Sequence, residues 1–524
     1  MKESARQYIM LPMNVGNIQR PTSNAQHPLN AQMAGIGCSM LDVGCWMFSS
    51  FGSWVQSANA AEVRGNQASN TPNHAEGSTF CKAWLVLLIC LAALCGRGQS
   101  TAPARELVQS RLAQECPSLL ELYKQLHSHP ELSFQEVQSA ARVAEELRKA
   151  GCEVTAGVGK GGVVGVLRNG AGPTVLIRAD MDALPVKEQT GLPYASMVTA
   201  KDAQGKDVPV MHACGHDIHM TWLVGAARVL GQIKDQWHGT VVFIGQPAEE
   251  AVGGALGMLE DGLFKRFPRP DYCVALHDDA ELATGTVGYT PGYSGANIDS
   301  VDITVHGVGG HGAYPHKTKD PVVLAAQIIL ALQTIVSREV RPGEPAVVTV
   351  GTIHGGTRRN IIPDEVRLHL TVRTYKEEVR QQTLEAIKRI ARGQALAAGI
   401  PEDRLPEVKV TDEITPALYN DPKLTERLVG ALKGWFGETN LIQKPPSMGG
   451  EDFSEFGRTE PKVPICMMNV GGVSPAALKE SQRIGKPLPS LHSPLWAPVP
   501  EPTIKAGVTT MTAFVLELLG KRAE

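Results

Sequence analysis

The sequence has few aromatic residues and almost no net charge. Aromatic residues make up 5% of its 524 residues, and the formal net charge is -3 at pH 7. A nearly neutral chain has no excess of basic residues with which to attract nucleic acid or an anionic membrane. We therefore expect no nucleic-acid partner.

A regular cysteine framework is also lacking. None of the spacings among the ten cysteines is typical of a zinc finger or of a small disulfide-bonded domain. The apolar fraction of 43% and the charged fraction of 20% are those of a globular protein, which excludes disorder of the whole chain, a collagen helix and a coiled coil. The 53 glycines suit many tight turns between strands and helices, and we expect an α/β protein.

The first 104 residues differ from the rest. Up to Phe80 they are rich in Asn, Gln, Ser and Gly, and we expect a disordered extension. Lys82, the apolar run 83–95 and a small-residue exit to residue 103 are typical of a secretory signal, although such signals begin a chain. The run is shorter than the roughly 20 residues of a spanning helix. We expect export to the periplasm or outside the cell, or anchoring through 83–95. The alternative is a cytoplasmic protein with a non-functional segment.

From residue 105 onward, apolar runs alternate with helical patterns. Leucines and a valine at helical spacing between residues 107 and 126 predict a helix, and a second helix follows at 133–150. Short apolar runs near Val164, Leu176, Val242 and Val274 are typical of buried strands. The alternation predicts a mostly parallel sheet with helices on both faces, whose ligands bind at the carboxyl ends of the strands.

A different order of elements interrupts this pattern at 297–414. Strand, helix, two strands, helix and strand follow one another, which is the ferredoxin-like arrangement. We expect an inserted domain there, with 105–296 and 415–524 forming one discontinuous catalytic, metal-binding domain. The predicted elements are 300–307, 321–338, 346–354, 365–374, 376–398 and 407–412.

Candidate metal ligands follow the predicted strands. Thiolates, imidazoles and carboxylates together bind borderline-soft divalent ions. Cys214 and His216 share a glycine-containing turn, His277 ends an apolar strand, and His492 precedes Ser-Pro near the carboxyl terminus. Each has a structural alternative: a small buried thiol, a helix cap, a strand-end histidine or a loop histidine.

Two carboxylate pairs accompany these ligands. Adjacent Glu249 and Glu250 are costly to bury without a cation, so one could bind a metal while the other takes a proton from water. The alternative is a solvated pair in a loop. Asp180 and Asp182 lie on one face of a strand end and could orient ligand imidazoles, or could serve the turn before Pro185.

The inserted segment offers three further candidates. Gly309 and Gly310 allow a tight backbone path before His311, whose imidazole could face a substrate or could lie at an exposed hairpin tip. Asn360 and Arg373 could bind a carboxylate or an amide, or could cap strands.

Six motifs in order, MHACGHD, QPAEE, GGHGAYPH, NIIPD, GGEDF and LHSP, resemble the metal-dependent amidohydrolases that include hippurate hydrolase, bacterial aminoacylases and auxin-conjugate hydrolases. The resemblance covers residues 105 to about 519. It implies two divalent ions per subunit and a homodimer formed through the inserted domain, which would also act as a lid. Mn, Zn, Co and Ni all suit the nitrogen, oxygen and sulfur ligands, and the sequence does not choose among them. The resemblance also implies roles for residues: Glu249 as general base, His311 and Asn360 as substrate-contacting residues, and Cys214, His216, Glu250, His277 and His492 as metal ligands.

Several positions depart from the family pattern. Asp278 and Asp279 stand where an apolar and then an aromatic or proline-rich sequence is expected, and Trp222 is bulkier than expected. Arg358 and Arg359 replace smaller residues and favour an acidic substrate. These departures bear on the choice of substrate more than on the chemistry.

We expect metal-dependent hydrolysis of the amide bond of an N-acyl amino acid or a related small amide, with His311 helping to polarise the carbonyl group. One alternative is a metallo-exopeptidase acting on dipeptides. Another is a metal-binding or ligand-binding protein without turnover. Glu249 favours the enzyme, because a binding protein needs ligands but no base.

Overall fold

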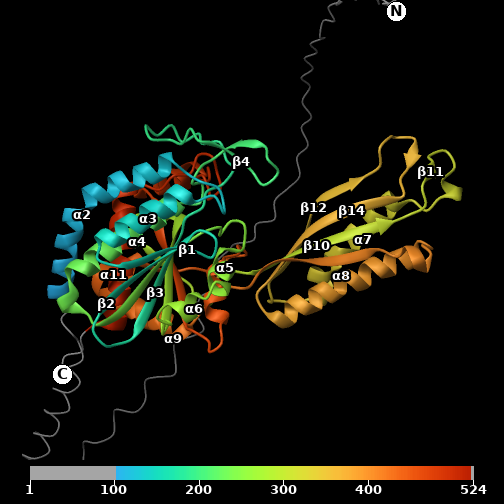
Figure 1. Cartoon of the computed structure of the whole chain (residues 1–524). Helices are drawn as coiled ribbons and strands as arrows, with labels where there is room; N and C mark the ends of the chain where they lie inside the picture. Colours follow the sequence, from blue (N-terminus) through green and yellow to red (C-terminus); the bar gives the residue numbers. More distant parts are fainter. Residues whose placement is uncertain (1–101, 521–524) are drawn as a thin grey trace, which may run out of the picture. The chain divides into compact units, whose positions relative to one another are not determined.

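The structure, a computed structural model, describes residues 102–520 (Figure 1). The apolar run 83–95, on which the export prediction depends, lies outside these residues. Helix α2 (Ala102–Ser128) begins within the last residues of the predicted signal-like segment.

The larger domain is built on an eight-stranded sheet in the order β1-β2-β6-β3-β7-β18-β8-β17. Its four central strands are parallel to one another, which confirms the predicted parallel sheet at the centre. Both edges contain antiparallel pairs, β1 with β2, β2 with β6, and β18 with β8. The strands are β1 (Glu153–Val158), β2 (Gly162–Asn169), β3 (Thr174–Asp180), β6 (Gly239–Gln246), β7 (Tyr272–Ala283), β8 (Val287–Tyr289), β17 (Leu441–Gln443) and β18 (Ile465–Val473).

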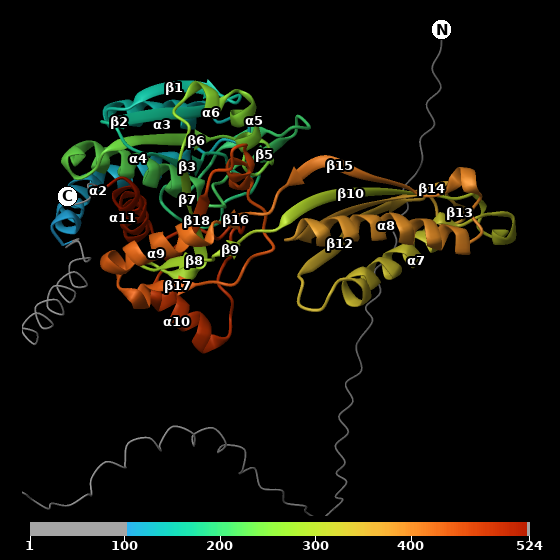
Figure 2. The same ribbon diagram turned by 90° about the horizontal axis from the view of Figure 1, so that it is seen from below.

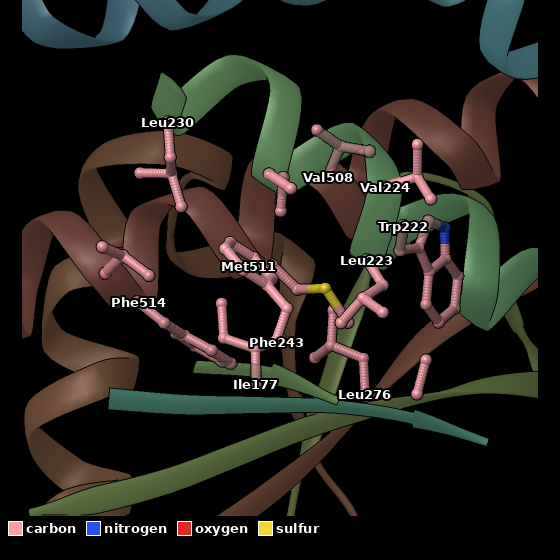
Figure 3. Close-up of a cluster of buried hydrophobic side chains, with 14 of the residues drawn as sticks. Ile177, Trp222, Leu223, Val224, Leu230, Phe243, Leu276, Val508, Met511 and Phe514 are labelled. Atoms are coloured by element: carbon pink, nitrogen blue, oxygen red, sulfur yellow. The ribbon is translucent and has the colours of Figure 1, made fainter. Parts of the chain in front are cut away.

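Helices cover both faces of this sheet, so its central strands are apolar on both sides. Alternate residues of one strand separate into two cores: Ile177 packs beneath one helical layer, and Leu176 packs beneath the other. Figure 3 shows Ile177 and Phe243 meeting Met511 and Phe514 in the first core. That layer contains α2, α3 (Val137–Lys149), α4 (His216–Gln232), α9 (Pro422–Phe436) and α11 (Pro500–Leu519), and the second contains α5 (Gly254–Glu260), α6 (Leu263–Arg266) and η6 (Asp452–Arg458).

Trp222 is part of this packing. Its side chain is fully buried between α4 and α11, and its Nε1 donates to the Thr503 carbonyl oxygen at 2.9 Å. A Cβ atom at Gly507 would lie 2.3 Å from the indole, so this glycine makes room for the ring. The expectation that Trp222 affects substrate choice is therefore wrong, because the neighbouring helix accommodates its bulk.

The inserted segment forms a four-stranded antiparallel sheet in the order β12-β14-β10-β15. Helices α7 and α8 cover one face (Figure 2), and β10 alternates strictly between buried and half-buried residues. The predicted ferredoxin-like order is confirmed. Its elements are β10 (Asn297–His306), α7 (Pro321–Thr334), η3 (Ile335–Glu339), β12 (Ala346–Gly355), β14 (Glu365–Thr374), α8 (Glu377–Ala397) and β15 (Glu407–Thr415).

The continuous helical stretch Pro321–Glu339 is long and apolar enough to span a membrane by length and composition alone. Leu324, Ile328 and Leu332 nevertheless lie in the core of the inserted domain, so this stretch is a packed helix.

The remaining elements of the described residues are short. They are β4 (Thr199–Lys201), β5 (Asp207–Pro209), β9 (Gly292–Tyr293), β11 (Gly310–His311), β13 (Ile361–Ile362), β16 (Tyr419–Asn420), α10 (Pro475–Ile484), η1 (Lys234–Gln236), η2 (Pro315–Lys317), η4 (Glu402–Arg404) and η5 (Glu438–Asn440).

A buried charge cluster joins the end of α2 to the start of α4. His127 Nδ1 lies 2.6 Å from Asp217 Oδ2, and His127 Nε2 lies 3.0 Å from Glu188 Oε1. The rings of Tyr123 and Tyr194 flank the imidazole. Burial alone would lower the pKa of His127, but hydrogen bonds to Asp217 and Glu188 outweigh it and raise the pKa to about 9. The imidazolium therefore neutralises part of a buried acidic pair.

We predict that His127 makes stability depend on pH. Because its folded pKa is raised above the usual value of about 6.5, its contribution is fully present below pH 6.5 and is lost as the pH rises through about 9. At pH 6, His127→Gln should lower the free energy of unfolding by about 3 kcal/mol, since it leaves two buried carboxylates without their cation. Urea denaturation should show this difference shrinking towards pH 10, and a constant difference would contradict the assignment.

Candidate metal centre

The predicted ligands meet at the carboxyl edge of the central strands. Glu249 and Glu250 directly follow β6, and His277 lies within β7. His216 is the first residue of α4. The turn before it requires Gly215, whose φ is +75° and whose added Cβ would lie 2.5 Å from the Asp278 carboxylate. Only glycine allows the turn to approach that carboxylate, and so to present both neighbouring ligand side chains.

The thiol of Cys214 lies at the centre of the cluster. Its Sγ is 3.5 Å from His277 Nε2 and 3.2 Å from His492 Nε2. Glu250 Oε1 is 3.2 Å from His492 Nε2 and 4.0 Å from His216 Nε2. The five predicted ligands, although scattered from residue 214 to residue 492, are thus brought together.

The cluster attracts positive charge. His277 Nδ1 donates to the Asp278 carbonyl oxygen at 2.8 Å, which leaves the Nε2 facing the thiol to accept the thiol proton, to carry a proton itself or to contact a metal ion. Burial opposes protonation of His277 and His216, yet the charges of Cys214 and Asp180 raise their pKa values well above the usual range. Burial raises the pKa of the Cys214 thiol, but the charge of His277 and the contacts with His277 and His492 lower it to about 7.

Divalent cations could replace the protons on the imidazole nitrogens and the thiol of this cluster. Cys214, His216 and His277 have donor atoms within 4.8 Å of one another, as do Cys214, Glu250 and His492. Among the described residues, His216 Nε2 is buried and has no hydrogen-bonding partner. A buried imidazole nitrogen facing carboxylates is satisfied by a metal ion, and this donor set suits a borderline-soft ion.

The two predicted orienting aspartates both lie beside His216, and Asp180 also contacts a second histidine. Asp182 Oδ1 is 3.3 Å from His216 Nδ1, and the same carboxylate accepts from the backbone N–H groups of Glu249 and Glu250. Asp180 Oδ2 lies 3.6 Å from His216 Nε2, and its Oδ1 lies 2.6 Å from Nδ1 of His219, which was not predicted as part of the site. The backbone N–H of Asp278 donates to His219 Nε2, so both ring nitrogens of His219 are engaged within the protein.

Three backbone positions around the site have left-handed dihedral angles without being glycine. These are Ala248 (φ 49°), immediately before the glutamate pair, Val252 (φ 50°), two residues after it, and His492 (φ 66°). Such conformations cost energy and concentrate at functional sites, where the surrounding structure enforces them. The Ala248 N–H donates to Glu136 Oε1 at 2.7 Å, which holds this turn in place.

Glu249 lies beside the cluster among other acids. It is 13% exposed, and its Oε2 is 4.0 Å from His216 Nε2. Burial, followed by the charges of Glu451 and Glu250, raises the pKa of Glu249 well above its usual range. Glu451 and Asp452, the acids of the GGEDF motif, lie close by without having been assigned in the sequence, and Arg178 pairs with both.

A cavity of about 560 Å³ opens beside the cluster. Glu249, Glu250, His277 and His492 line one side, and Arg373 of the inserted domain also lines it. Among the described residues that form this cavity, neither His311 nor Asn360 is found. The structure therefore brings Arg373, but not these two residues, to the predicted metal ligands.

His311 and Asn360 lie instead at the far end of the inserted sheet. His311 is exposed on β11, and Asn360 directly precedes β13, its partner strand (Figure 1). Ten-residue β10 separates this end from the one that contains Arg373, a span of about 30 Å. Arg358 and Arg359 lie at the same far end, next to Asn360.

A sheet-edge cluster of a thiol, imidazoles and carboxylates, with a further glutamate beside it, defines a metal-dependent hydrolase. The chain belongs to peptidase family M20/M25/M40, whose model matches residues 176–483. It is 37% identical to thermostable carboxypeptidase 1 of Saccharolobus solfataricus over 342 residues, 64% of this chain and 82% of that protein. It is 40% identical to hippurate hydrolase of Campylobacter jejuni over 335 residues, 63% of this chain and 83% of that protein.

Solved structures agree with this family. The Bacillus subtilis YXEP protein, described as a dinuclear metal-binding peptidase of family M20, superimposes with a TM-score of 0.63 and 30% identity, covering 78% of this chain and 99% of that chain. The predicted family, the fold class and the metal-dependent amidohydrolase activity are confirmed, and so is the predicted pair of divalent ions as the cofactor class.

We predict that Cys214→Ser lowers the affinity for divalent metal by at least about 100-fold, since residues that only support a ligand already contribute 10- to 100-fold. Cys273→Ala, in a buried cysteine on β7 outside the cluster, should retain the metal and serves as the matched control. Metal content after dialysis, measured by mass spectrometry of the elements, checks this. Equal metal retention by both variants would show that Cys214 is not a metal ligand.

Proposed function

We propose that this protein hydrolyses the amide bond of N-acyl amino acids. The observation that carries the proposal is the carboxylate of Glu249, which lies beside the ligand cluster and lines the cavity that Arg373 also lines. A guanidinium suits the α-carboxylate that an N-acyl amino acid presents. The similarity to hippurate hydrolase, whose name states such a substrate, supports the same conclusion.

We assign the binding of two divalent ions to the cluster around Cys214. When bound, such ions polarise the amide carbonyl and lower the pKa of water. The donor set suits Mn, Zn, Co or Ni. The ligands we assign are Cys214, His216, Glu250, His277 and His492.

Glu249 is assigned the proton transfers. Its carboxylate takes a proton from the water whose oxygen attacks the carbonyl carbon, and it passes that proton to the amide nitrogen as the C–N bond breaks. The products are a carboxylate and a free amino acid. A raised pKa suits this role, because a base must accept the proton near neutral pH and then release it.

We predict that Glu249→Gln lowers kcat by about 10²- to 10⁴-fold while the metal content is retained, because the amide preserves the shape of the side chain and removes its basicity. Glu260→Gln, in an exposed glutamate on α5, is the matched control. Hydrolysis of N-acetyl and N-benzoyl amino acids, assayed beside unblocked dipeptides, checks both the base and the substrate class. An unchanged rate would refute the base. Cleavage of the dipeptides alone would favour the exopeptidase.

We also propose a homodimer formed through the inserted domain, in which the partner copy supplies His311 and Asn360. Within one chain these residues lie about 30 Å from the Arg373 end of their sheet. Strand β12 is an edge strand of that sheet. The exposed fractions of Leu330 and Ile353, 72% and 52%, give the domain an apolar surface for a second copy.

Mixing two inactive variants tests the shared site. Glu249→Gln and His311→Ala should each be inactive, and after subunit exchange about a quarter of the sites should combine both native residues. Recovery of about a quarter of the native activity, with a dimeric mass by light scattering, is the expected result. A monomeric mass, or no recovery after exchange demonstrated by mass spectrometry, would contradict the shared site.

The proposal for localisation rests on the sequence alone. We propose export, directed or anchored by the apolar run 83–95 that follows Lys82.

A further inference from the structure

The wall of the cavity holds a lysine that the proposed reaction does not use. Lys444 directly follows β17, and its Nζ forms an ion pair with the carboxylate of Asp279, near the end of β7. Both residues line the cavity that Glu249 and Arg373 also line. The Asp279 side chain is 5% exposed and that of Lys444 is 24% exposed, so the ammonium remains reachable from the cavity.

Both ends of the lysine are fixed. Its backbone N–H donates to the Tyr289 carbonyl oxygen at 2.9 Å, and its carbonyl oxygen accepts from Thr290 Oγ1 at 3.1 Å. Its aliphatic stem crosses Gly288, where an added Cβ would lie 2.9 Å from Lys444 Cδ. The stem therefore packs against Gly288, where a side chain would displace it.

Asp279 is fixed in the same way. Its Oδ1 accepts from the backbone N–H groups of Glu281 and Leu282 at 2.8 and 3.1 Å, which leaves Oδ2 for the ammonium. A lysine held at both ends loses little conformational entropy when it binds an anion. Asp279 acts here as a positioning residue for Lys444.

The charges around the cavity leave this ammonium available. Arg178 pairs with Glu451 and Asp452, and the metal ions of the proposed function would be held beside Glu249 and Glu250 by the ligand cluster. Lys444 has three N–H donors, of which Asp279 occupies one. Arg373 is the second cation on the cavity wall, and its Nη1 donates to the Met448 carbonyl oxygen.

We propose that Lys444 binds a second carboxylate of the substrate, so that the preferred substrates are N-acyl amino acids with two carboxylates. This inference rests on the proposed function. Arg373 binds the α-carboxylate, and Lys444 binds a carboxylate on either the amino-acid side chain or the acyl chain. Asp279, one of the departures from the family pattern, thereby acts on substrate choice through Lys444.

Two acids, each with its neutral amide isostere, test the proposal in the metal-loaded enzyme. N-acetylglutamate is compared with N-acetylglutamine, which places the second carboxylate on the amino acid. N-succinyl-leucine is compared with N-succinamoyl-leucine, which places it on the acyl chain. In at least one pair, kcat/KM should favour the acid by about 10- to 100-fold, the range of a hydrogen bond to a charged group. That pair identifies the position of the second carboxylate.

The variants then assign the preference to Lys444. Lys444→Met keeps the stem and removes the charge, so the acid-to-amide ratio should fall towards one, mainly through a higher KM for the acid. Lys444→Arg should restore part of the ratio. Lys433→Met, in a lysine of α9 that pairs with Glu438 outside the cavity, should keep the native ratio.

Three outcomes would overturn the inference. The wild type could hydrolyse acids and amides equally well, or Lys444→Met, with a native melting temperature, could lower kcat/KM for acid and amide by the same factor. Either result leaves the proposed function intact and assigns Lys444 a structural role. Failure to hydrolyse any of the four substrates or a further N-acyl amino acid would overturn the proposed function itself, and the inference with it.

Discussion

The buried negative charge at the carboxyl edge of the sheet is the constraint on which the rest of the site depends. Asp180, Asp182, Asp278, Glu451 and Asp452 are all nearly inaccessible to solvent, and Glu249 and Glu250 lie beside them. So many carboxylates cannot be buried together unless cations offset them. The fold supplies one such cation from its own sequence, and the remaining charge calls for ions from solution.

Arg178 is the internal cation. It is fully buried on β3, and its guanidinium donates to Gln246, Asp180, Glu451 and Asp452. One side chain thereby joins β3, the end of β6 and the segment at η6, which come from distant parts of the sequence. Loss of this guanidinium would leave Asp180, Glu451 and Asp452 buried without their arginine, so its role is to make the burial of these acids compatible with folding. The carboxylates on the histidine side of the edge, Asp182, Asp278 and Glu250, form no ion pair with an arginine or lysine in the described part of the chain. Their charge is therefore offset by protonated histidines or by metal ions.

The sequence predicted the parts of the site that follow from local order. Glu249, Glu250 and His277 lie on or directly after apolar strands, and parallel strands bring their carboxyl ends to one edge, so their convergence could be expected. Cys214 and His216 are linked by a glycine turn. The ferredoxin-like order of elements could also be predicted, because the apolar residues of each long strand and helix in that domain recur at the spacing typical of its type.

What the sequence could not show were contacts between segments that no local pattern connects. Asp278 lies next to a predicted ligand, yet its contacts with His219 and with Trp496 Nε1 depend on the packing of α4 and of the carboxyl-terminal segment. The antiparallel pair of β18 with β8 was missed for a different reason: β8 is three residues long and too short to show a period. The distance of His311 from the metal ligands could not be predicted either, because the sequence around a histidine does not indicate at which end of the sheet it lies.

The departures from the family pattern fall into two groups, residues that contribute to packing or ligand orientation and a residue that lines the cavity. Trp222 is matched by Gly507, and Asp278 by Gly215, so each is accommodated by a glycine and contributes to packing or to ligand orientation. Asp279 differs, because its partner Lys444 lies on the cavity wall. A charge pair there alters what the cavity can bind without touching the metal ligands or Glu249. Chemistry and substrate choice are thus carried by different residues of β7, with His277 facing the thiol and Asp279 two positions further on, and substrate choice can change while the metal centre stays the same.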